Sequence, residues 1–138
     1  MCFHYSLGQS AKNLENRYNA HIGPTGFFIP THHVNGFNFP MMPVITDKSP
    51  QEIQFFNWGL IPSWVKSVEK ADQIRLSTLN AKSETAFEKP SFKKAIAQKR
   101  CLVPFDGFFE WMAYQGKRYP HFIFIKDYPI FSFAGIWE

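Results

Sequence analysis

The second half of the chain constrains the fold most strongly, because it consists of apolar, strand-like runs separated by short breaks. The four runs are Cys101 to Phe105, Phe108 to Ala113, Tyr119 to Lys126 and Ile130 to Ile136. The breaks between them hold Asp106-Gly107, Gln115-Gly116 and Asp127-Tyr128. Short apolar runs with turn residues between them are typical of β-strands, so this half predicts a β-meander or a barrel wall.

The first half adds a few helices and a long loop. Ser10 is placed to cap a short helix in which Leu14 and Tyr18 share one face. The other expected elements are a surface loop over 23–40, strands over 42–46 and 52–58, a short helix over 81–88, and a helix capped by Ser91 that buries Phe92, Ala95 and Ile96. The whole pattern predicts an α+β fold, with residues 1–138 forming a single domain.

Composition indicates a globular protein with an anionic partner. The chain has 138 residues, of which 45% are hydrophobic, and its net charge is +4 with a pI near 9.1. Neither a signal peptide nor an apolar run of about 18 residues is visible, so we expect a soluble, intracellular protein without a membrane partner. Exposed aromatic rings beside basic residues would suit single-stranded nucleic acid, where bases stack on aromatic faces.

The two cysteines, Cys2 and Cys101, are too few for a disulfide framework. Cys101 lies in an apolar run, so we expect a buried, inert thiol there. Cys2 is different, because removal of Met1 would leave an α-amine and a thiol on adjacent carbons. The amine has a reference pKa of about 7.7–8.0, so part of it is nucleophilic near neutral pH. Such an aminothiol attacks an aldehyde to give an imine, and the sulfur then closes a five-membered thiazolidine ring.

Two further segments carry side chains suited to chemistry. Asn80 begins the segment Asn80-Ala81-Lys82-Ser83-Glu84, which by itself also fits a helix start with Asn80 as the N-cap. Glu110 lies between aromatic residues on a predicted strand. If Glu110 faces outward it is an ordinary solvated residue, whereas facing a pocket it would be desolvated and suited to proton transfer.

Five segments together carry a family resemblance. They are Met1-Cys2, Trp58-Gly59-Leu60-Ile61-Pro62-Ser63-Trp64, Asn80-Ala81-Lys82-Ser83-Glu84, Gly107-Phe108-Phe109-Glu110-Trp111 and Phe133-Ala134-Gly135-Ile136-Trp137-Glu138. In order and spacing they resemble the SOS-response-associated peptidase (SRAP) family, across nearly the whole chain. The resemblance implies a compact α+β, barrel-like domain of the DNA damage response.

The resemblance also implies a function. Family members lose the initiator Met and use Cys2 to crosslink abasic sites in single-stranded DNA, with lyase and autopeptidase activities as further possibilities. It implies that Cys2, Asn80 and Glu110 are catalytic. The expected DNA contacts are Lys82, Trp64, Trp111, His4 and Asn35. We expect no cofactor and no metal, a monomer, and a bacterial-type cytoplasmic location with nucleoid association on DNA.

The chain departs from the family pattern in three places. Lys82 stands where the family usually has Arg, and Lys lacks the bidentate guanidinium fork. Phe3 and His4 replace a Gly-Arg pair, so a phosphate contact near Cys2 becomes weaker at neutral pH. The family's catalytic His follows the segment that ends here at Glu138, so we expect the gene product to continue. If Met1 is retained, the Cys2 nitrogen is an amide and cannot react.

Three alternatives stay open from the sequence. The first is a thiol peptidase in which Cys2 is paired with a histidine, the candidates being His4, His21, His32, His33 and His121. The second is a noncatalytic module that binds single-stranded DNA. The third is a metal site formed by Cys2, His4, His32 and His33, although these residues lack the usual ligand spacing.

Overall fold

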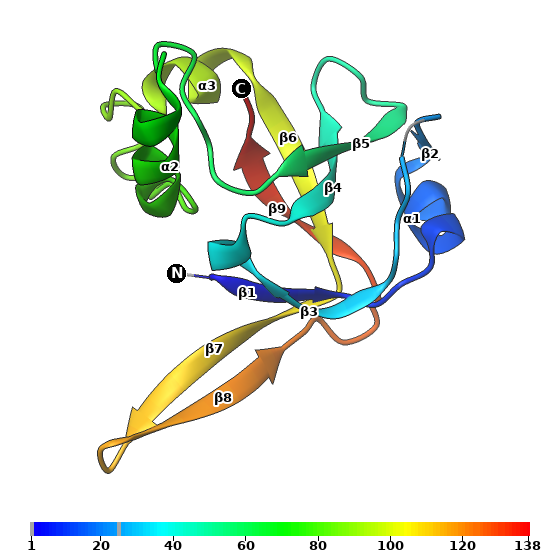
Figure 1. The fold of residues 1–138 in the computed structure, drawn as a ribbon. Coiled ribbons are helices and arrows are strands. Elements are labelled where there is room, and N and C mark those ends of the chain that lie inside the picture. Colours follow the sequence, from blue (N-terminus) through cyan, green and yellow to red (C-terminus); the bar gives the residue numbers. More distant parts are fainter. Residues whose placement is uncertain (1, 25) are drawn as a thin grey trace.

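The computed structural model describes residues 2–24 and 26–138, and its strands form two sheets with three α-helices at the periphery (Figure 1). In chain order the elements are β1 (His4–Leu7), α1 (Ala11–Tyr18), β2 (His21–Ile22), β3 (Thr31–Asn35), the 3-10 turn η1 (Gly36–Asn38), β4 (Met41–Thr46), β5 (Glu52–Asn57), α2 (Val68–Ser77), α3 (Lys93–Gln98), β6 (Arg100–Phe105), β7 (Gly107–Tyr114), β8 (Lys117–Ile123) and β9 (Phe131–Ile136). The expected α+β class is confirmed.

Strands that follow one another in the sequence are often not neighbours in the two sheets. One sheet has the order β3-β1-β7-β8 and the other β2-β5-β4-β6-β9. The four runs expected after Cys101 each contain a strand, although β8 ends at Ile123 and not at the expected Lys126, and the strands do not form a meander. Strands β7 and β8 form a hairpin that joins β1, whereas β6 pairs with β4 and β9. The local residue pattern predicts that a segment forms a strand. Which strands pair depends on the joint burial of residues that are far apart in the sequence.

A corner at Asp106 takes the chain from one sheet to the other. The Asp106 N–H donates to the carbonyl of Ser6 at 2.9 Å, and its Oδ2 accepts from the Gly8 N–H at 2.6 Å. Gly107 follows at once, where a Cβ atom would collide with the ring of Phe122. Asp106 is the only residue between β6 and β7. The position of this corner therefore fixes the start of β7 and, along that strand, the position of Glu110.

Aromatic rings fill the space where the two sheets meet. Phe105 of β6 and Phe133 of β9 stack with ring centroids 3.6 Å apart, and Tyr5 of β1 packs edge-on against both. Tyr5 and Phe105 are each 2% exposed. Burial of such side chains contributes roughly 1.5–3 kcal/mol each. The N-terminal strand is thereby anchored to the centre of the core.

Helix α1 agrees with its sequence signals. The Ser10 hydroxyl accepts from the Asn13 N–H at 3.2 Å, and Leu14 is fully buried. The hydroxyl of Tyr18 bonds to Ser132 at 2.6 Å, which ties the helix to β9. Among the residues described, no helix is long and apolar enough to cross a membrane.

Several expected elements differ in the structure. The loop expected over 23–40 contains β3 and η1, because Val34 is buried and pairs with Tyr5. The segment 81–88 forms turns and not a regular helix. Helix α3 begins at Lys93 without a side-chain cap, so the Ser91 cap was wrong. Helix α2 was not expected, since it buries no residue and lacks an apolar stripe; its Ser67 cap accepts from the Lys70 N–H.

Candidate functional site

Cys2 lies two residues before the start of β1, and a side chain from the middle of the chain holds it in place. Asn80 Nδ2 donates to the Cys2 carbonyl at 2.9 Å. Cys2 itself is part-buried, and its thiol donates to the His4 carbonyl at 3.2 Å. No helix begins at Asn80, because the next residues form turns, so the helix-cap alternative for Asn80 is wrong.

The loop that carries Asn80 is attached to the core beneath β1. Trp58 Nε1 donates to the Leu79 carbonyl at 2.7 Å, and the Trp58 ring lies 5.4 Å from the ring of Tyr5. Thr78, which is buried, donates through its hydroxyl to the Leu60 carbonyl at 2.7 Å. Two part-buried side-chain hydrogen bonds therefore fix the residues just before Asn80.

Glu110 reaches the same region from β7. Strands β1 and β7 are antiparallel, with Tyr5 opposite Phe108, so Glu110 lies beside the segment that leads back to Cys2. Burial raises the pKa of the Cys2 thiol above its usual value, a main-chain hydrogen bond with His4 partly offsets this, and the charge of Glu110 raises the pKa further. The thiol therefore keeps its proton at neutral pH, and the charge of Glu110 contributes to this.

Three of the predicted DNA contacts gather at the same end of β1. The ring of Trp111 packs edge-on against His4 with centroids 4.8 Å apart, and Trp111 is 38% exposed. Asn35 lies opposite His4 on β3. The Asn35 side chain accepts from the Phe37 N–H at 3.0 Å, which starts the turn η1. The side chain of Asn35 therefore also stabilises the turn that follows β3.

The two other predicted DNA contacts lie on the helical side of the molecule. Lys82 is exposed on the turn two residues after Asn80. Trp64 is 54% exposed on the loop between β5 and α2. The place of Trp64 at a DNA interface stays a prediction.

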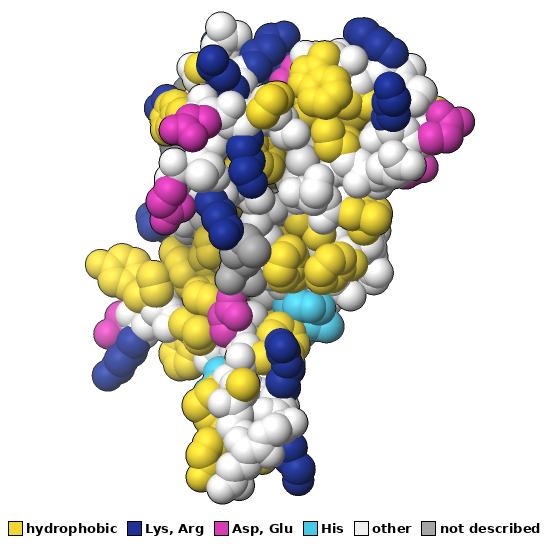
Figure 2. All heavy atoms as spheres, turned by 90° about the vertical axis from the view of Figure 1, so that its left-hand side faces the viewer, with side chains coloured by type: hydrophobic (Ala, Val, Ile, Leu, Met, Phe, Trp, Pro, Cys, Tyr) yellow, Lys and Arg dark blue, Asp and Glu magenta, His cyan; other side chains and the backbone are white. Residues whose placement is uncertain are grey.

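A basic surface surrounds Lys82, in a part of the chain whose charge the sequence analysis did not single out. Of the 15 Lys and Arg residues, nine lie between positions 66 and 100, where there are four acidic residues. The exposed lysines of this surface are Lys66, Lys70, Lys82, Lys89, Lys93 and Lys94. Figure 2 shows basic side chains gathered on the upper part of the face on which β1 begins, with hydrophobic ones across the middle. The density of Lys and Arg between positions 66 and 100 is the feature of the sequence that indicates this surface.

The metal alternative finds no support in the geometry. In residues 2–24 and 26–138, no group of three or more His, Cys, Asp and Glu side chains is arranged to hold a metal ion. His32 and His33 are adjacent on β3, so their side chains point to opposite faces. His32 lies beside Gly8, whereas His33 contacts His4.

These observations define a class of protein: a two-sheet α+β domain in which Asn80 and Glu110, from separate segments, converge on a cysteine at position 2. The family model described as "SOS response associated peptidase (SRAP)" matches residues 1–138. The chain belongs to this family.

Similar proteins and structures agree with that assignment. The abasic site processing protein YoqW of Bacillus subtilis is 33% identical over all of this chain, and the abasic site processing protein HMCES of Rattus norvegicus is 41% identical over 59% of it. A solved structure from Bacteroides thetaiotaomicron has a TM-score of 0.91 and 46% identity over 99% of this chain, which covers 61% of that structure's chain. The chain spans 60% of the length of YoqW and 24% of the length of HMCES.

Proposed function

We propose that the full-length protein captures abasic sites in single-stranded DNA by forming a covalent bond through Cys2. The observation that carries the proposal is the 2.9 Å hydrogen bond from Asn80 to the Cys2 carbonyl, with the charge of Glu110 acting on the same residue. Such contacts would present an aminothiol in one orientation. The names of the relatives YoqW and HMCES, both abasic site processing proteins, support the choice of substrate.

The chemistry requires that Met1, which lies outside the described residues, be removed. The free Cys2 amine then adds to the aldehyde of the ring-opened deoxyribose, and loss of one water gives an imine. The sulfur adds to the imine carbon, and the thiol proton ends on the nitrogen, which completes a thiazolidine. A thiol that keeps its proton at neutral pH brings the proton this ring closure needs, and Glu110 would pass it on to the nitrogen.

The remaining roles follow from position. Asn80 would hold Cys2 and Glu110 would assist opening of the sugar ring and imine formation. Lys82, Trp111, His4, Asn35 and Trp64 would contact the DNA strand, with the basic surface attracting phosphates. We include in the proposal strand cleavage from the imine stage, and removal of Met1 by the protein itself.

A general thiol peptidase is less well supported. Such an enzyme needs a thiolate, normally formed by a neighbouring imidazole. Here the thiol donates to the main-chain carbonyl of His4, and burial raises the pKa of Cys2. Both observations favour the protonated thiol over a reactive thiolate.

The test uses the full-length protein, with removal of Met1 verified by intact mass. Wild-type protein and abasic single-stranded DNA should give an adduct that survives denaturation. Cys2→Ser keeps the amine but carries a poor ring-closing hydroxyl, so it should give an adduct only after borohydride reduction. Protein that retains Met1 should give neither, because an amide nitrogen is not nucleophilic.

The outcomes separate the alternatives. A peptidase would cleave peptides, lose that activity on Cys2→Ser and show no borohydride-dependent adduct. A noncatalytic binding module would bind DNA in a salt-dependent way and form no adduct in any variant. Absence of a stable adduct from processed wild-type protein would refute the proposal.

A further inference from the structure

Beside Cys2, two histidines from different strands form a hydrogen-bonded pair. His4 Nδ1 of β1 lies 3.0 Å from His33 Nε2 of β3. The ring planes are within 5° of parallel, with centroids 5.1 Å apart. The carbonyl of His4 also accepts the Cys2 thiol proton. The pair is therefore joined to the main chain that positions the proposed nucleophile.

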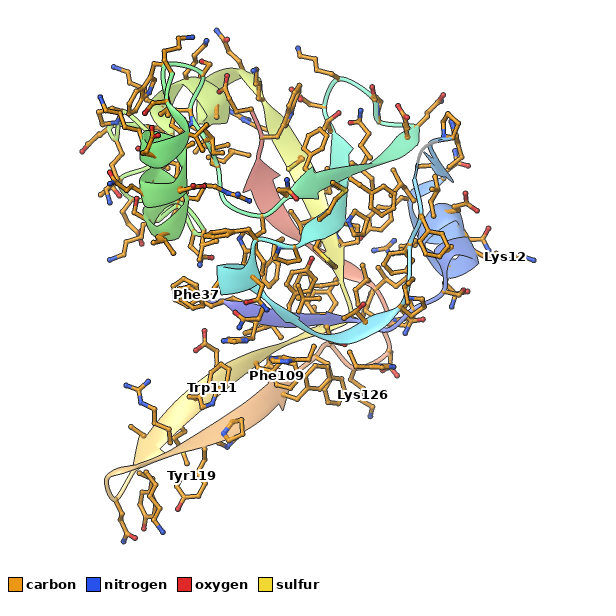
Figure 3. All side chains as sticks on the ribbon, in the orientation of Figure 1. Lys12, Phe37, Phe109, Trp111, Tyr119 and Lys126 are labelled. Carbon is orange, nitrogen blue, oxygen red and sulfur yellow. The ribbon has the colours of Figure 1, made fainter. Side chains whose placement is uncertain are left out.

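Two aromatic side chains from β7 hold the pair. Trp111 packs edge-on against His4, and Phe109 packs edge-on against His33 with centroids 5.4 Å apart. In Figure 3 both rings project from the hairpin on the side of β1. Glu110 lies between them in sequence, so its side chain points to the other face of β7. The histidine pair thus lies next to the proposed reaction site without sharing the face of Glu110.

Counting protons shows what the pair can bind. Two neutral imidazoles carry two N–H groups, one of which occupies the bond between the rings. One additional proton makes that bond charge-assisted and leaves an N–H donor on the outer nitrogen of each ring. A second additional proton would set two N–H groups against each other, so it is disfavoured. The pair therefore behaves as a unit that gains one charge and two outward donors with a single proton.

We propose that His4 and His33 together form a binding site for one DNA phosphate next to the nucleotide captured by Cys2, and that one shared proton controls its strength. This inference rests on the proposed function and specifies how the strand is held there. A single positive charge with two outward N–H donors matches the oxygens of a phosphodiester. Trp111, beside the pair, offers an exposed ring on which the adjoining base can stack.

The electrostatic surroundings agree with uptake of a single proton. Burial lowers the pKa of His4 and the neighbouring His33 lowers it further, as expected for two rings that compete for one proton. The other titratable groups on the elements around the pair are the Cys2 thiol before β1, Glu110 on β7, His121 opposite Glu110 on β8, and His32 on the far face of β3.

The test measures binding without covalent chemistry. The ligand is single-stranded DNA with a tetrahydrofuran abasic analogue, which has no aldehyde, and the protein is full-length. Fluorescence anisotropy gives affinities from about pH 8 to about pH 5.5 at fixed salt. Wild-type protein should bind about tenfold more tightly at the lower pH, as expected for one gained charge-assisted contact. The slope of log affinity against log salt should steepen by about 0.7, because one more phosphate is neutralised.

Variants assign the effect to the pair. His33→Gln should lose most of the gain at low pH, although it keeps the same thiol, amine and Glu110. His4→Arg carries a permanent charge, so it should bind at about pH 8 as tightly as wild type does at about pH 5.5, with a flat profile. His21→Gln, an exposed histidine on β2, is the matched control and should keep the wild-type profile.

A flat wild-type profile, or a His33→Gln profile that keeps the full gain, would overturn the proposal. If His33→Gln does not fold, NMR titration of the wild-type imidazoles decides instead: both rings should respond to one proton and both should shift on addition of inorganic phosphate. The tetrahydrofuran analogue cannot crosslink, so binding and capture are tested separately. If the affinity for the analogue depends on pH but true abasic DNA is not crosslinked, only the proposed capture chemistry is refuted. Efficient crosslinking with a flat profile would refute only the histidine site.

Discussion

Asn80 and Cys2 are 78 residues apart in sequence, yet the Asn80 side-chain amide donates to the Cys2 carbonyl at 2.9 Å. The contact links the start of β1 to a loop that Trp58 and Thr78 tie to the core. A residue at the second position of a chain normally has considerable freedom. Here one hydrogen bond from a fixed loop restricts it, and that restriction can be tested directly.

Replacement of Asn80 by Ala should slow crosslinking about fivefold at saturating DNA, because it removes one part-buried hydrogen bond worth on the order of 1 kcal/mol. Asn80→Asp should be slower still, since a carboxylate oxygen would face the Cys2 carbonyl. The rate is measured by quenched time courses on denaturing gels. Asn16→Ala, on the exposed side of α1, is the control. Equal rates for Asn80→Ala and wild type would show that the contact does not position Cys2.

Replacement of Glu110 by Gln should lower the pKa of the Cys2 thiol, because the negative charge of Glu110 adds to the effect of burial in raising it. The pH dependence of iodoacetamide alkylation in a Cys101→Ala background reports this pKa without DNA. The same variant should crosslink about 10²–10⁴-fold more slowly, as expected for loss of acid–base assistance. Glu88→Gln, on an exposed turn, should change neither quantity. An unshifted alkylation profile would place Glu110 too far from Cys2 to act on it.

Replacement of Lys82 by Ala should weaken binding of single-stranded DNA and reduce the slope of log affinity against log salt by about 0.7, since one phosphate contact is lost. Lys82→Arg should restore the slope. Lys48→Ala, on the exposed turn between β4 and β5, removes the same charge elsewhere and serves as the control. If Lys82→Ala and Lys48→Ala behave alike, Lys82 contributes only to the overall charge.

The two thiols should differ in reactivity. Burial, followed by the charge of Asp47, raises the pKa of Cys101 to about 11, and the residue is 8% exposed. Below that pKa the folded protein holds Cys101 as an inert thiol, so alkylation at about pH 8 should modify Cys2 alone. Mass spectrometry of the alkylated protein gives the site, and denaturant should make both thiols reactive. Modification of Cys101 at a rate equal to that of Cys2 in folded protein would contradict this placement.

The sequence by itself was sufficient for features that depend on neighbouring residues. The Ser10 cap, the turn at Gln115-Gly116 and the strands after Cys101 follow from local conformational preferences, and the structure confirms each of them. Five short segments in their order also identified the family, and the match over residues 1–138 confirms it. The functional roles of the predicted site residues stay predictions, both for the three catalytic residues and for the five DNA contacts.

Only the tertiary structure decided which of those segments meet. From its own segment Asn80 is best explained as a helix cap, and only the family resemblance gave it the role of holding Cys2; the choice depends on β1 lying beside its loop. The pairing of β6 with β9, the two-sheet corner at Asp106 and the contact of His4 with His33 join residues far apart in sequence. Such contacts form because burial of Tyr5, Phe105 and their neighbours is favourable only when all strands pack together. The residue pattern within one segment does not show which distant segments it will pack against.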